Sequence, residues 1–401
     1  MPVAQRTLIA MQRSSWIRKM FETGLVLKKQ YGEDRVFDFS LGNPDVASPP
    51  AFDAALIAEA SKSGVYRHGY MQNQGYLETR QAVADHLQST VGLPFTPDQV
   101  IMTCGAAGAI NVILKAILNP GEEVIVIAPF FTEYDFYIEN HQGKMVIAQT
   151  TPELLPDLDD IAAKITSKTR AIIINSPNNP TGRVYQKELL SALGQILTSK
   201  GQAIAHPIYL ISDEPYRRIV YDGRECPSVF HFYRHTILTT SFSKDLSLAG
   251  ERIGYLAVSP LIEDHAQIIQ AAIFCNRVLG YINAPALMQR VIARVLTEAV
   301  DVERYARRRD LIYHGLKSIG YEVIKPEGAF YIFPKSPIPD DVAFIHRLQE
   351  QLIIATPGVA FYKPGYFRLS YAVPEWVIEK ALPGFAAVLK QYQKAKGAKN
   401  E

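Results

Sequence analysis

The sequence predicts an α/β protein with two domains. The large domain is expected to hold a mainly parallel sheet flanked by helices, and the smaller domain to be α+β. Short β-rich runs alternate with helical patterns between about residues 95 and 260, which is the rhythm of βαβ units. After about residue 285 the pattern changes to longer helices and one late strand near 367–372. The 401 residues are enough to bury two cores.

The β-rich runs define the expected sheet strand by strand. They lie at 100–104, 123–129, 144–149, 170–177, 208–215, 236–243 and 252–258. Residues 171–174 are apolar on both faces, as in strands that helices cover on each side. We therefore expect an N-terminal arm at 1–48, a large domain at 49–285 and a small domain at 286–401.

A helical run at 302–318 carries four arginines, Arg304, Arg307, Arg308 and Arg309. They could form an anion-binding patch. The apolar stripe of Tyr305, Leu311 and Ile312 favours an ordinary amphipathic helix, and we expect the arginines to form a solvated charged face.

Charge and composition exclude several classes of protein. The net charge of +2 gives no large field for nucleic acid or an anionic membrane. The three cysteines, Cys104, Cys226 and Cys275, form no CxxC pair and no metal-ligand spacing, so we expect no metal. The longest apolar run, 124–131, is far too short to span a bilayer, and charges interrupt the first thirty residues. We expect a soluble, untargeted cytoplasmic protein.

The strongest chemical signal is residues 241–255, SFSKDLSLAGERIGY, which follow a predicted strand. A lysine at a strand end can lose its proton through burial and nearby charge and become a nucleophile toward an aldehyde. Ser241, Ser243 and Arg252 are residue types that hold a phosphate dianion. Taken alone, an exposed loop lysine is an equally good interpretation of Lys244.

Two further polar residues follow predicted strands. Asn179 lies in the turn SPNNPTG and can donate to a phenolate oxygen, although a purely structural turn also explains this segment. Asp213 follows an apolar strand and needs a cationic partner such as a protonated pyridine nitrogen, or else caps the next helix. The small-residue turn Gly105-Ala106-Ala107 precedes a helix and can present amides to phosphate.

In this order the motifs resemble fold-type-I pyridoxal-phosphate (PLP) enzymes, and among them the class I, aspartate aminotransferase family. The resemblance covers almost the whole chain. It rests on SLGNPD at 40–45, Tyr70 with Gly75, CGAAGA, APFF, NSPNNPTG, SDEPY, SFSK with Arg252, and FRLSY at 367–371. It implies that the smaller α+β domain is built from both chain ends, with residues 1–48 forming the N-terminal arm and part of that domain.

The resemblance implies a role for each matched residue. Lys244 would form the internal aldimine with PLP and move the proton, and Asp213 would pair with the pyridine nitrogen. Asn179 and Tyr216 would bond the phenolic oxygen, and Phe131 would stack on the ring unless it is an ordinary core residue. The implied substrate-binding residues are Gly42, Asn179 and Arg368. The implied phosphate contacts are Gly105, Ala106, Ala107, Ser241, Ser243, Arg252 and, from the second subunit of a homodimer, Tyr70.

The expected activity is transfer of the amino group of an L-amino acid to a 2-oxo acid, with 2-oxoglutarate as the expected acceptor, by a ping-pong mechanism. A PLP-dependent β-lyase or decarboxylase is the alternative, and a non-catalytic PLP-binding regulator is a third class. Some dicarboxylate-specific relatives have a lysine where this chain has Ala107. Arg67, His68, Arg277 and Lys363 fit surface positions better than a site for a distal carboxylate. Aromatic residues expected near the pocket, Phe130, Tyr134, Tyr281 and Tyr362, suit a larger or less acidic side chain.

Overall fold

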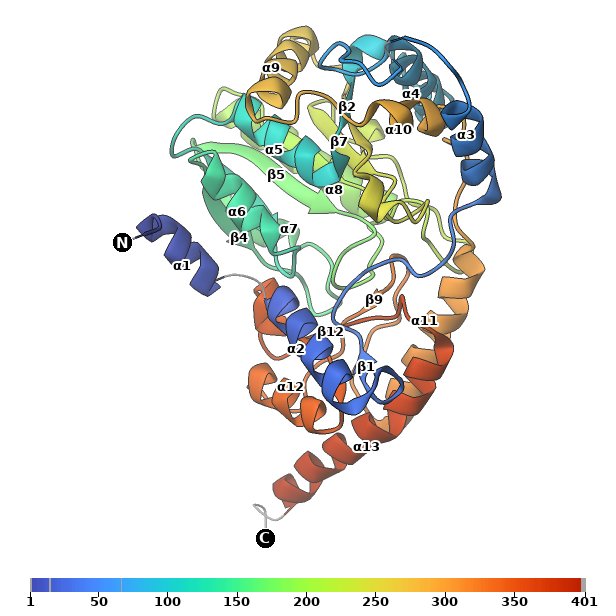
Figure 1. The fold of residues 1–401 in the computed structure, drawn as a ribbon. Coiled ribbons are helices and arrows are strands. Elements are labelled where there is room, and N and C mark those ends of the chain that lie inside the picture. The colour runs from blue at the N-terminus through green and yellow to red at the C-terminus, as the bar shows by residue number, and fades with distance from the viewer. Residues whose placement is uncertain (1, 14–15, 66, 398–401) are drawn as a thin grey trace.

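The computed structural model describes residues 2–13, 16–65 and 67–397. Its centre is a seven-stranded sheet in the order β2-β8-β7-β6-β5-β3-β4 (Figure 1). The strands are β2 (Val100–Thr103), β3 (Glu123–Ile127), β4 (Lys144–Ala148), β5 (Thr169–Asn175), β6 (Tyr209–Asp213), β7 (Thr236–Ser241) and β8 (Gly254–Val258). Strand β8 is antiparallel to both its neighbours, and the other pairs are parallel. Every predicted β-rich run overlaps one of these strands, and the mainly parallel sheet is confirmed.

Helices bury both faces of this sheet. Along β5, Ile172 and Ile174 belong to one apolar cluster and Ala171 and Ile173 to another, because alternate side chains point to opposite faces. One face packs under α5 (Gly105–Ile117), α6 (Glu133–Asn140) and α9 (His265–Val278), and the other under α7 (Leu158–Lys164) and α8 (Lys187–Ala203). This two-sided burial explains the continuous apolar runs in the sequence.

A third apolar cluster joins α3 (Pro50–Ala60), α4 (Leu77–Val91) and α10 (Ala286–Ile292) beside β2 and β8. Met288, Val291 and Ile292 of α10 pack in the same cluster as Phe52 and Val83. The domain division at residue 285 stays a prediction, and this packing favours a boundary somewhat further along the chain.

The lower part of the molecule in Figure 1 combines both ends of the chain. Its helices are α2 (Trp16–Tyr31), α11 (Val302–Ile319), α12 (Asp341–Glu350) and α13 (Glu375–Gly397). Strand β1 (Phe37–Asp38) pairs with β10 (Ile353–Ile354), and a second small sheet has the order β11 (Thr356–Pro357), β12 (Phe367–Ser370), β9 (Tyr331–Ile332). Phe39 and Phe385 share its core, so the prediction of an α+β unit built from both chain ends agrees with this packing.

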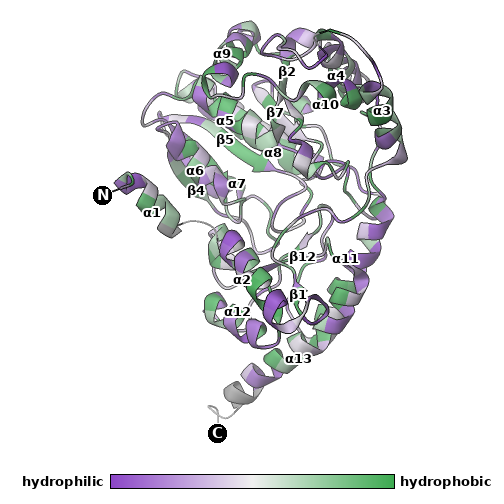
Figure 2. Cartoon of the chain, in the orientation of Figure 1, coloured by the Kyte–Doolittle hydropathy of each residue, from purple (hydrophilic) through white to green (hydrophobic). Residues whose placement is uncertain are grey.

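The remaining elements are short or peripheral. Helix α1 (Gln5–Arg13) projects from the body of the molecule (Figure 1). The 3₁₀ helices are η1 (Glu33–Arg35), η2 (Pro97–Gln99), η3 (Val229–His231), η4 (Ala249–Glu251) and η5 (Gly358–Phe361). Figure 2 shows hydrophobic colour along the central strands and more hydrophilic colour on the outer helices. Among the described helices, none combines the length and the apolar character needed to cross a membrane.

The prediction for the arginines of α11 was wrong at two positions. Arg304 and Arg307 are exposed, but the side chains of Arg308 and Arg309 are each only 1% exposed. Arg308 Nη1 donates to Asp45 Oδ1 at 2.6 Å, and Arg309 makes two hydrogen bonds to the Asp222 carboxylate at 2.8 and 2.9 Å. A buried guanidinium requires such partners. Both carboxylates are remote in sequence, so the local pattern could not reveal them.

Candidate active site

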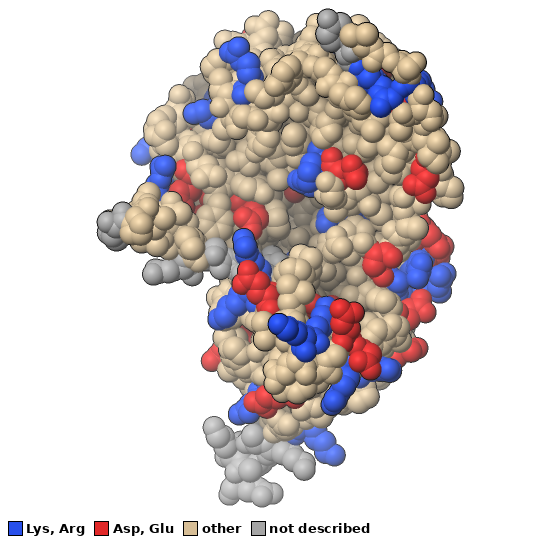
Figure 3. Space-filling view, in the orientation of Figure 1, with Lys and Arg blue, Asp and Glu red and all other residues tan. Residues whose placement is uncertain are grey.

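One cavity lies where the ends of β5, β6 and β7 meet the small sheet, and Figure 3 shows the molecule hollowed between its two parts. Most of the predicted site residues line it. They are Gly42, Ala106, Ala107, Phe131, Asn179, Asp213, Tyr216, Ser241, Ser243, Lys244, Arg252 and Arg368. The carboxyl ends of neighbouring parallel strands share one edge of the sheet, which is why residues far apart in sequence meet here.

Two predicted residues do not line this cavity. Gly105 lies next to it, because a Cβ added there would be 3.0 Å from an Arg252 guanidinium nitrogen. Tyr70 is 92% exposed and lines a separate groove with Arg67 and Arg290. The single chain therefore does not bring Tyr70 to the other site residues.

Asp213 is the last residue of β6, and among the described residues only one of its two carboxylate oxygens has a hydrogen-bond partner. Tyr134 donates from its hydroxyl to Asp213 Oδ2 at 2.6 Å. Oδ1 is buried and has no hydrogen-bond partner among the described residues. Burial and, less strongly, the nearby charge of Glu214 raise the pKa of Asp213 to about 7, against the lowering effect of the Tyr134 hydrogen bond. An orphaned buried carboxylate oxygen fits a protonated ring nitrogen, such as PLP presents.

Asn175 holds two of the site residues in register, and the sequence analysis missed it. Its Nδ2 donates to the backbone oxygen of Asp213 at 2.8 Å, and its Oδ1 accepts from the backbone N–H of Asn179 at 2.7 Å. Asn175 and Asp213 are direct partners across β5 and β6. A polar residue at the last position of a buried strand was the signal available in the sequence.

Lys244 follows β7 and is partly buried. Its Nζ donates to the backbone oxygen of Gly42 at 2.7 Å. Burial, together with the positive charges of Arg368 and Arg252, lowers the pKa of Lys244 to about 8. A lysine that loses its proton near neutral pH is a competent nucleophile.

Arg252 and the start of α5 form one corner of the cavity. Arg252 has left-handed backbone geometry, with φ 51°, and its Nη1 donates to the Ala249 oxygen at 3.0 Å. The N-cap residue of α5, Cys104, supplies no side-chain hydrogen bond to the helix. The first amides of α5 and the positive end of its dipole are thus available beside a guanidinium, which fits a phosphate group.

Arg368 on β12 is buried and aimed at the same cavity from the small sheet. Its Nη1 donates to Asn179 Oδ1 at 3.1 Å, and its Nη2 donates to the Ser40 backbone oxygen. The guanidinium carbon lies 4.8 Å from the ring centroids of both Tyr331 and Phe361. Such a held planar cation fits a carboxylate in a bidentate manner.

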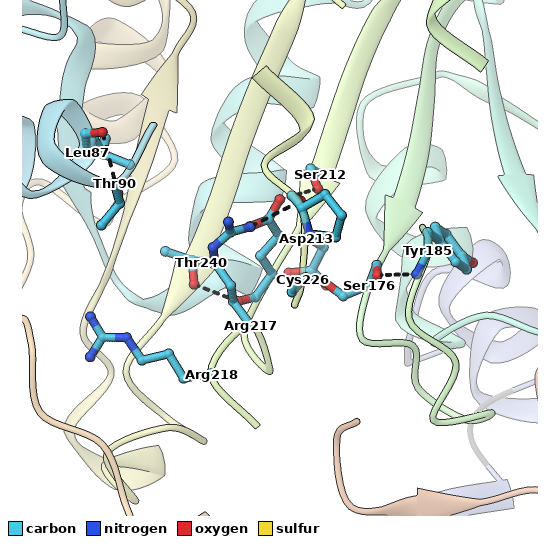
Figure 4. Close-up of polar contacts among 12 residues, drawn as sticks. Leu87, Thr90, Ser176, Tyr185, Ser212, Asp213, Arg217, Arg218, Cys226 and Thr240 are labelled. Carbon is cyan, nitrogen blue, oxygen red and sulfur yellow. Dashed lines mark hydrogen bonds and ion pairs between the residues drawn. The ribbon is translucent and has the colours of Figure 1, made fainter. Parts of the chain in front are cut away.

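A buried polar network behind the cavity holds the turns that carry these residues (Figure 4). Glu214 accepts from Ser212 Oγ at 2.7 Å and from Arg217 Nη1 at 2.8 Å. Nearby, the Cys226 thiol donates to the Ser176 backbone oxygen at 3.6 Å, at the start of the turn that holds Asn179. These contacts restrict the positions of the residues that face the cavity.

The four aromatic residues expected near the pocket do not line it. Phe130, Tyr134, Tyr281 and Tyr362 are not among the cavity-lining residues, whereas Tyr137 and Tyr331, which the sequence analysis did not select, are. The basic residues Arg67, His68, Arg277 and Lys363 also lie outside the cavity. Among the described residues, no group of acidic, histidine or cysteine side chains could hold a metal ion.

The fold and the lysine at the edge of its sheet define the fold-type-I class of PLP enzymes. Residues 34–384 match the family model described as aminotransferase class I and II. The chain belongs to this family and is a transaminase. The resemblance drawn from the sequence motifs is confirmed, and transamination is favoured over the lyase, decarboxylase and regulatory alternatives.

Three known proteins illustrate the similarity. The chain is 35% identical to the aspartate/prephenate aminotransferase of Thermus thermophilus over 91% of its own length and 93% of that protein. An aminotransferase structure from Eubacterium rectale matches with a TM-score of 0.94 and 37% identity, over 98% of this chain and 99% of that one. The structure of Thermus thermophilus aspartate aminotransferase with maleate matches with a TM-score of 0.86 and 31% identity, over 97% and 100%.

Proposed function

We propose that this chain uses PLP, held covalently by Lys244, to move the amino group of an L-amino acid to a 2-oxo acid. One observation carries the proposal. The easily deprotonated amine of Lys244 and the unsatisfied buried oxygen of Asp213 line the same cavity. PLP, when bound, supplies the electron sink that makes the α-proton of an amino acid removable.

The polar side chains of the cavity suit the edges of such a cofactor ring, and Phe131 suits one of its faces. Asp213 Oδ1 would hold a proton on the ring nitrogen. The Asn179 oxygen accepts from Arg368, so its Nδ2 remains as a donor toward the phenolic oxygen. Tyr216 would be the second donor to that oxygen. Phe131 lines the cavity and would cover the ring face.

The phosphate would lie against Arg252, Ser241, Ser243 and the amides at the start of α5. We also propose that the enzyme is a homodimer, in which Tyr70 of a second copy completes this phosphate site. The exposure of Tyr70 together with Val65 and Leu77 on one groove of the single chain supports this, because a contiguous exposed apolar surface is typical of a protein–protein contact.

Arg368 would bind the substrate α-carboxylate, with the Gly42 backbone beside it, and Lys244 would move the proton of the reacting carbon. The described cavity wall offers three cationic side chains, Lys244, Arg252 and Arg368, and the proposal uses all of them. Leu41, Ile110 and Tyr137 contribute apolar surface. We therefore propose a donor with an uncharged side chain, while a dicarboxylate such as 2-oxoglutarate would need a cation from the second copy.

Replacement of one lysine tests the cofactor assignment. Lys244→Ala should lose the covalently held cofactor, read by absorbance and borohydride trapping, and should lose turnover. Lys363→Ala is the matched control, because Lys363 is partly buried but lies outside the cavity. A fully active Lys244→Ala enzyme would refute the mechanism.

A panel of amino donors tests the substrate class. Aromatic, apolar and acidic amino acids are each mixed with the cofactor-loaded enzyme, and the half-reaction is followed by absorbance. Uncharged donors should react faster than aspartate or glutamate. The panel is then repeated with 2-oxoglutarate and with pyruvate as acceptors, and release of pyruvate and ammonia without an acceptor would instead indicate a lyase.

A further inference from the structure

Tyr331 occupies the point where the small sheet meets the cavity, and the proposed function gives it no task. It lies on β9, next to β12, with Ser370 as its direct partner across the strands. Its side chain is buried and lines the cavity. Arg368, on β12, is two residues from that partner, so the Tyr331 ring and the guanidinium project from adjacent strands.

The Tyr331 hydroxyl is surrounded by groups of the proposed site. It lies 2.9 Å from the Tyr216 hydroxyl, within hydrogen-bond distance. A Cβ added to Gly42 would overlap the Tyr331 hydroxyl, so the close approach of this backbone requires glycine. The oxygen of Gly42 in turn accepts from Lys244 Nζ. Tyr331 therefore contacts two of the residues that hold the reacting groups.

The direction of the hydrogen bond between the two tyrosines follows from the task of Tyr216. If Tyr216 donates its only proton to a phenolic oxygen in the cavity, it must accept the proton of Tyr331. Burial raises the pKa of Tyr331, although Arg368 opposes this rise, so Tyr331 keeps its proton and remains a donor at neutral pH. Two hydroxyls linked in series polarise each other, which strengthens the outer hydrogen bond.

The Tyr331 ring has a second contact. The guanidinium carbon of Arg368 lies 4.8 Å from its centroid, and the Phe361 ring lies at the same distance. Attraction between a cation and a ring face fixes the guanidinium without using its N–H groups. Those groups remain available for Asn179, Ser40 and a carboxylate.

We propose that Tyr331 is a positioning residue for amino transfer: its hydroxyl strengthens the donation of Tyr216 to the cofactor, and its ring holds Arg368 for the substrate carboxylate. This inference rests on the proposed function. In a purely structural role, Tyr331 would only fill the apolar cluster of the small sheet. The proposed role differs because loss of the hydroxyl should change the absorbance of the bound cofactor, whereas loss of the ring should change the KM for the amino donor.

Tyr331→Phe tests the hydroxyl. The cofactor-loaded enzyme is titrated with base and the midpoint of its visible absorbance change is recorded. Weaker donation by Tyr216 disfavours the deprotonated bound cofactor, so the midpoint should rise by about half to one pH unit, the equivalent of one hydrogen bond. The KM for the amino donor should change less than about twofold, because the ring over Arg368 remains.

Tyr331→Leu tests the ring. It keeps an apolar side chain in the cluster but removes the aromatic face beside Arg368. Here the KM for the amino donor should rise by about five- to tenfold, a change that Tyr331→Phe does not produce. The two variants thus separate the two contacts, and each variant gives an independent result if the other protein is poorly folded.

Tyr371→Phe is the matched control. Tyr371 is equally buried and its hydroxyl also faces a second tyrosine, Tyr221 at 3.4 Å, but it lies outside the cavity. Its absorbance midpoint and kinetics should equal those of the wild-type enzyme. In addition, Tyr216→Phe combined with Tyr331→Phe should shift the midpoint no further than Tyr216→Phe alone, because Tyr331 acts through Tyr216.

The outcomes separate this inference from the proposed function. If the wild-type enzyme shows no cofactor absorbance that depends on Lys244, the proposed function fails. If that absorbance is present and Tyr331→Phe leaves its midpoint unchanged or lowers it, the role of the hydroxyl is overturned. An unchanged KM in Tyr331→Leu overturns the role of the ring.

Discussion

Lys244 and Asp213 line one cavity, and burial shifts their pKa values in opposite directions. At pH 8 about half of the Lys244 amines are unprotonated if their pKa is about 8, whereas an ordinary lysine has under about 1%. The rate of covalent PLP capture by the cofactor-free protein, trapped with borohydride, should therefore rise with pH and level off above about pH 9. Arg368→Gln removes a nearby positive charge and should move this profile to higher pH. A rate that still climbs steeply beyond pH 10 would contradict the lowered pKa.

Asp213 links the cofactor site to stability. Because burial raises its pKa to about 7 in the folded chain, this group contributes stability that is fully present below about pH 4 and is lost as the pH rises through 7. In the cofactor-free protein, Asp213→Asn should therefore raise the free energy of unfolding relative to the wild-type protein. This gain should be larger at pH 8 than at pH 5 by about 2 to 3 kcal/mol. Denaturant unfolding at both pH values measures the difference. With PLP present, the wild-type protein should become more stable than Asp213→Asn. If Asp213→Asn changes the free energy of unfolding equally at pH 5 and pH 8, the raised pKa of Asp213 is refuted.

Residues at strand ends could be predicted from sequence, whereas residues that act through tertiary contacts could not. Asn179, Asp213 and Lys244 each follow an apolar run, and the topology of a parallel sheet brings such positions together. Tyr331 lies in a strand of two residues that has no readable period, and its partner Tyr216 is 115 residues away. Its place beside the cavity depends on how the two parts of the chain pack.

At the scale of elements, α11 shows how one helix can hold two kinds of arginine. Arg308→Ala should lower the free energy of unfolding by about 2 to 4 kcal/mol, because it removes a buried guanidinium paired with a partly exposed Asp45. Arg307→Ala, on the same helix but exposed, should change it by less than about 0.5 kcal/mol. Denaturant unfolding of both variants provides the comparison. If Arg308→Ala and Arg307→Ala lower the free energy of unfolding equally, the ion pair between Arg308 and Asp45 contributes nothing to stability.

The strands show the same limit of sequence-based prediction. All seven strands of the large sheet were predictable, because each is a run of four to seven residues that contains apolar and β-branched side chains. Their order was not, and in particular the place of β8 as an antiparallel strand between β2 and β7. The short strands β1, β9, β10 and β11 have two residues each, too few for any pattern to emerge.

At the scale of the whole molecule, one predicted residue remains apart from the site. Tyr70 lies in a groove lined also by Gln72, Tyr76 and Arg290, away from the cavity that holds Lys244. The proposed homodimer resolves this separation, because a two-fold interface lets each chain supply Tyr70 to the other chain's cavity.

Mixing two defective enzymes tests this arrangement. A hybrid of a Lys244→Ala chain and a Tyr70→Ala chain has one cavity with both changes and one with neither. After exchange of equal amounts, activity at limiting PLP should therefore approach about a quarter of the wild-type value, above the mean of the two parents. Lys244→Ala mixed with Asp213→Asn is the control: both changes lie in a chain's own cavity, so every hybrid site keeps one defect and activity should not rise. If the first mixture, with exchange verified, gains no more than this control, Tyr70 does not serve the second chain.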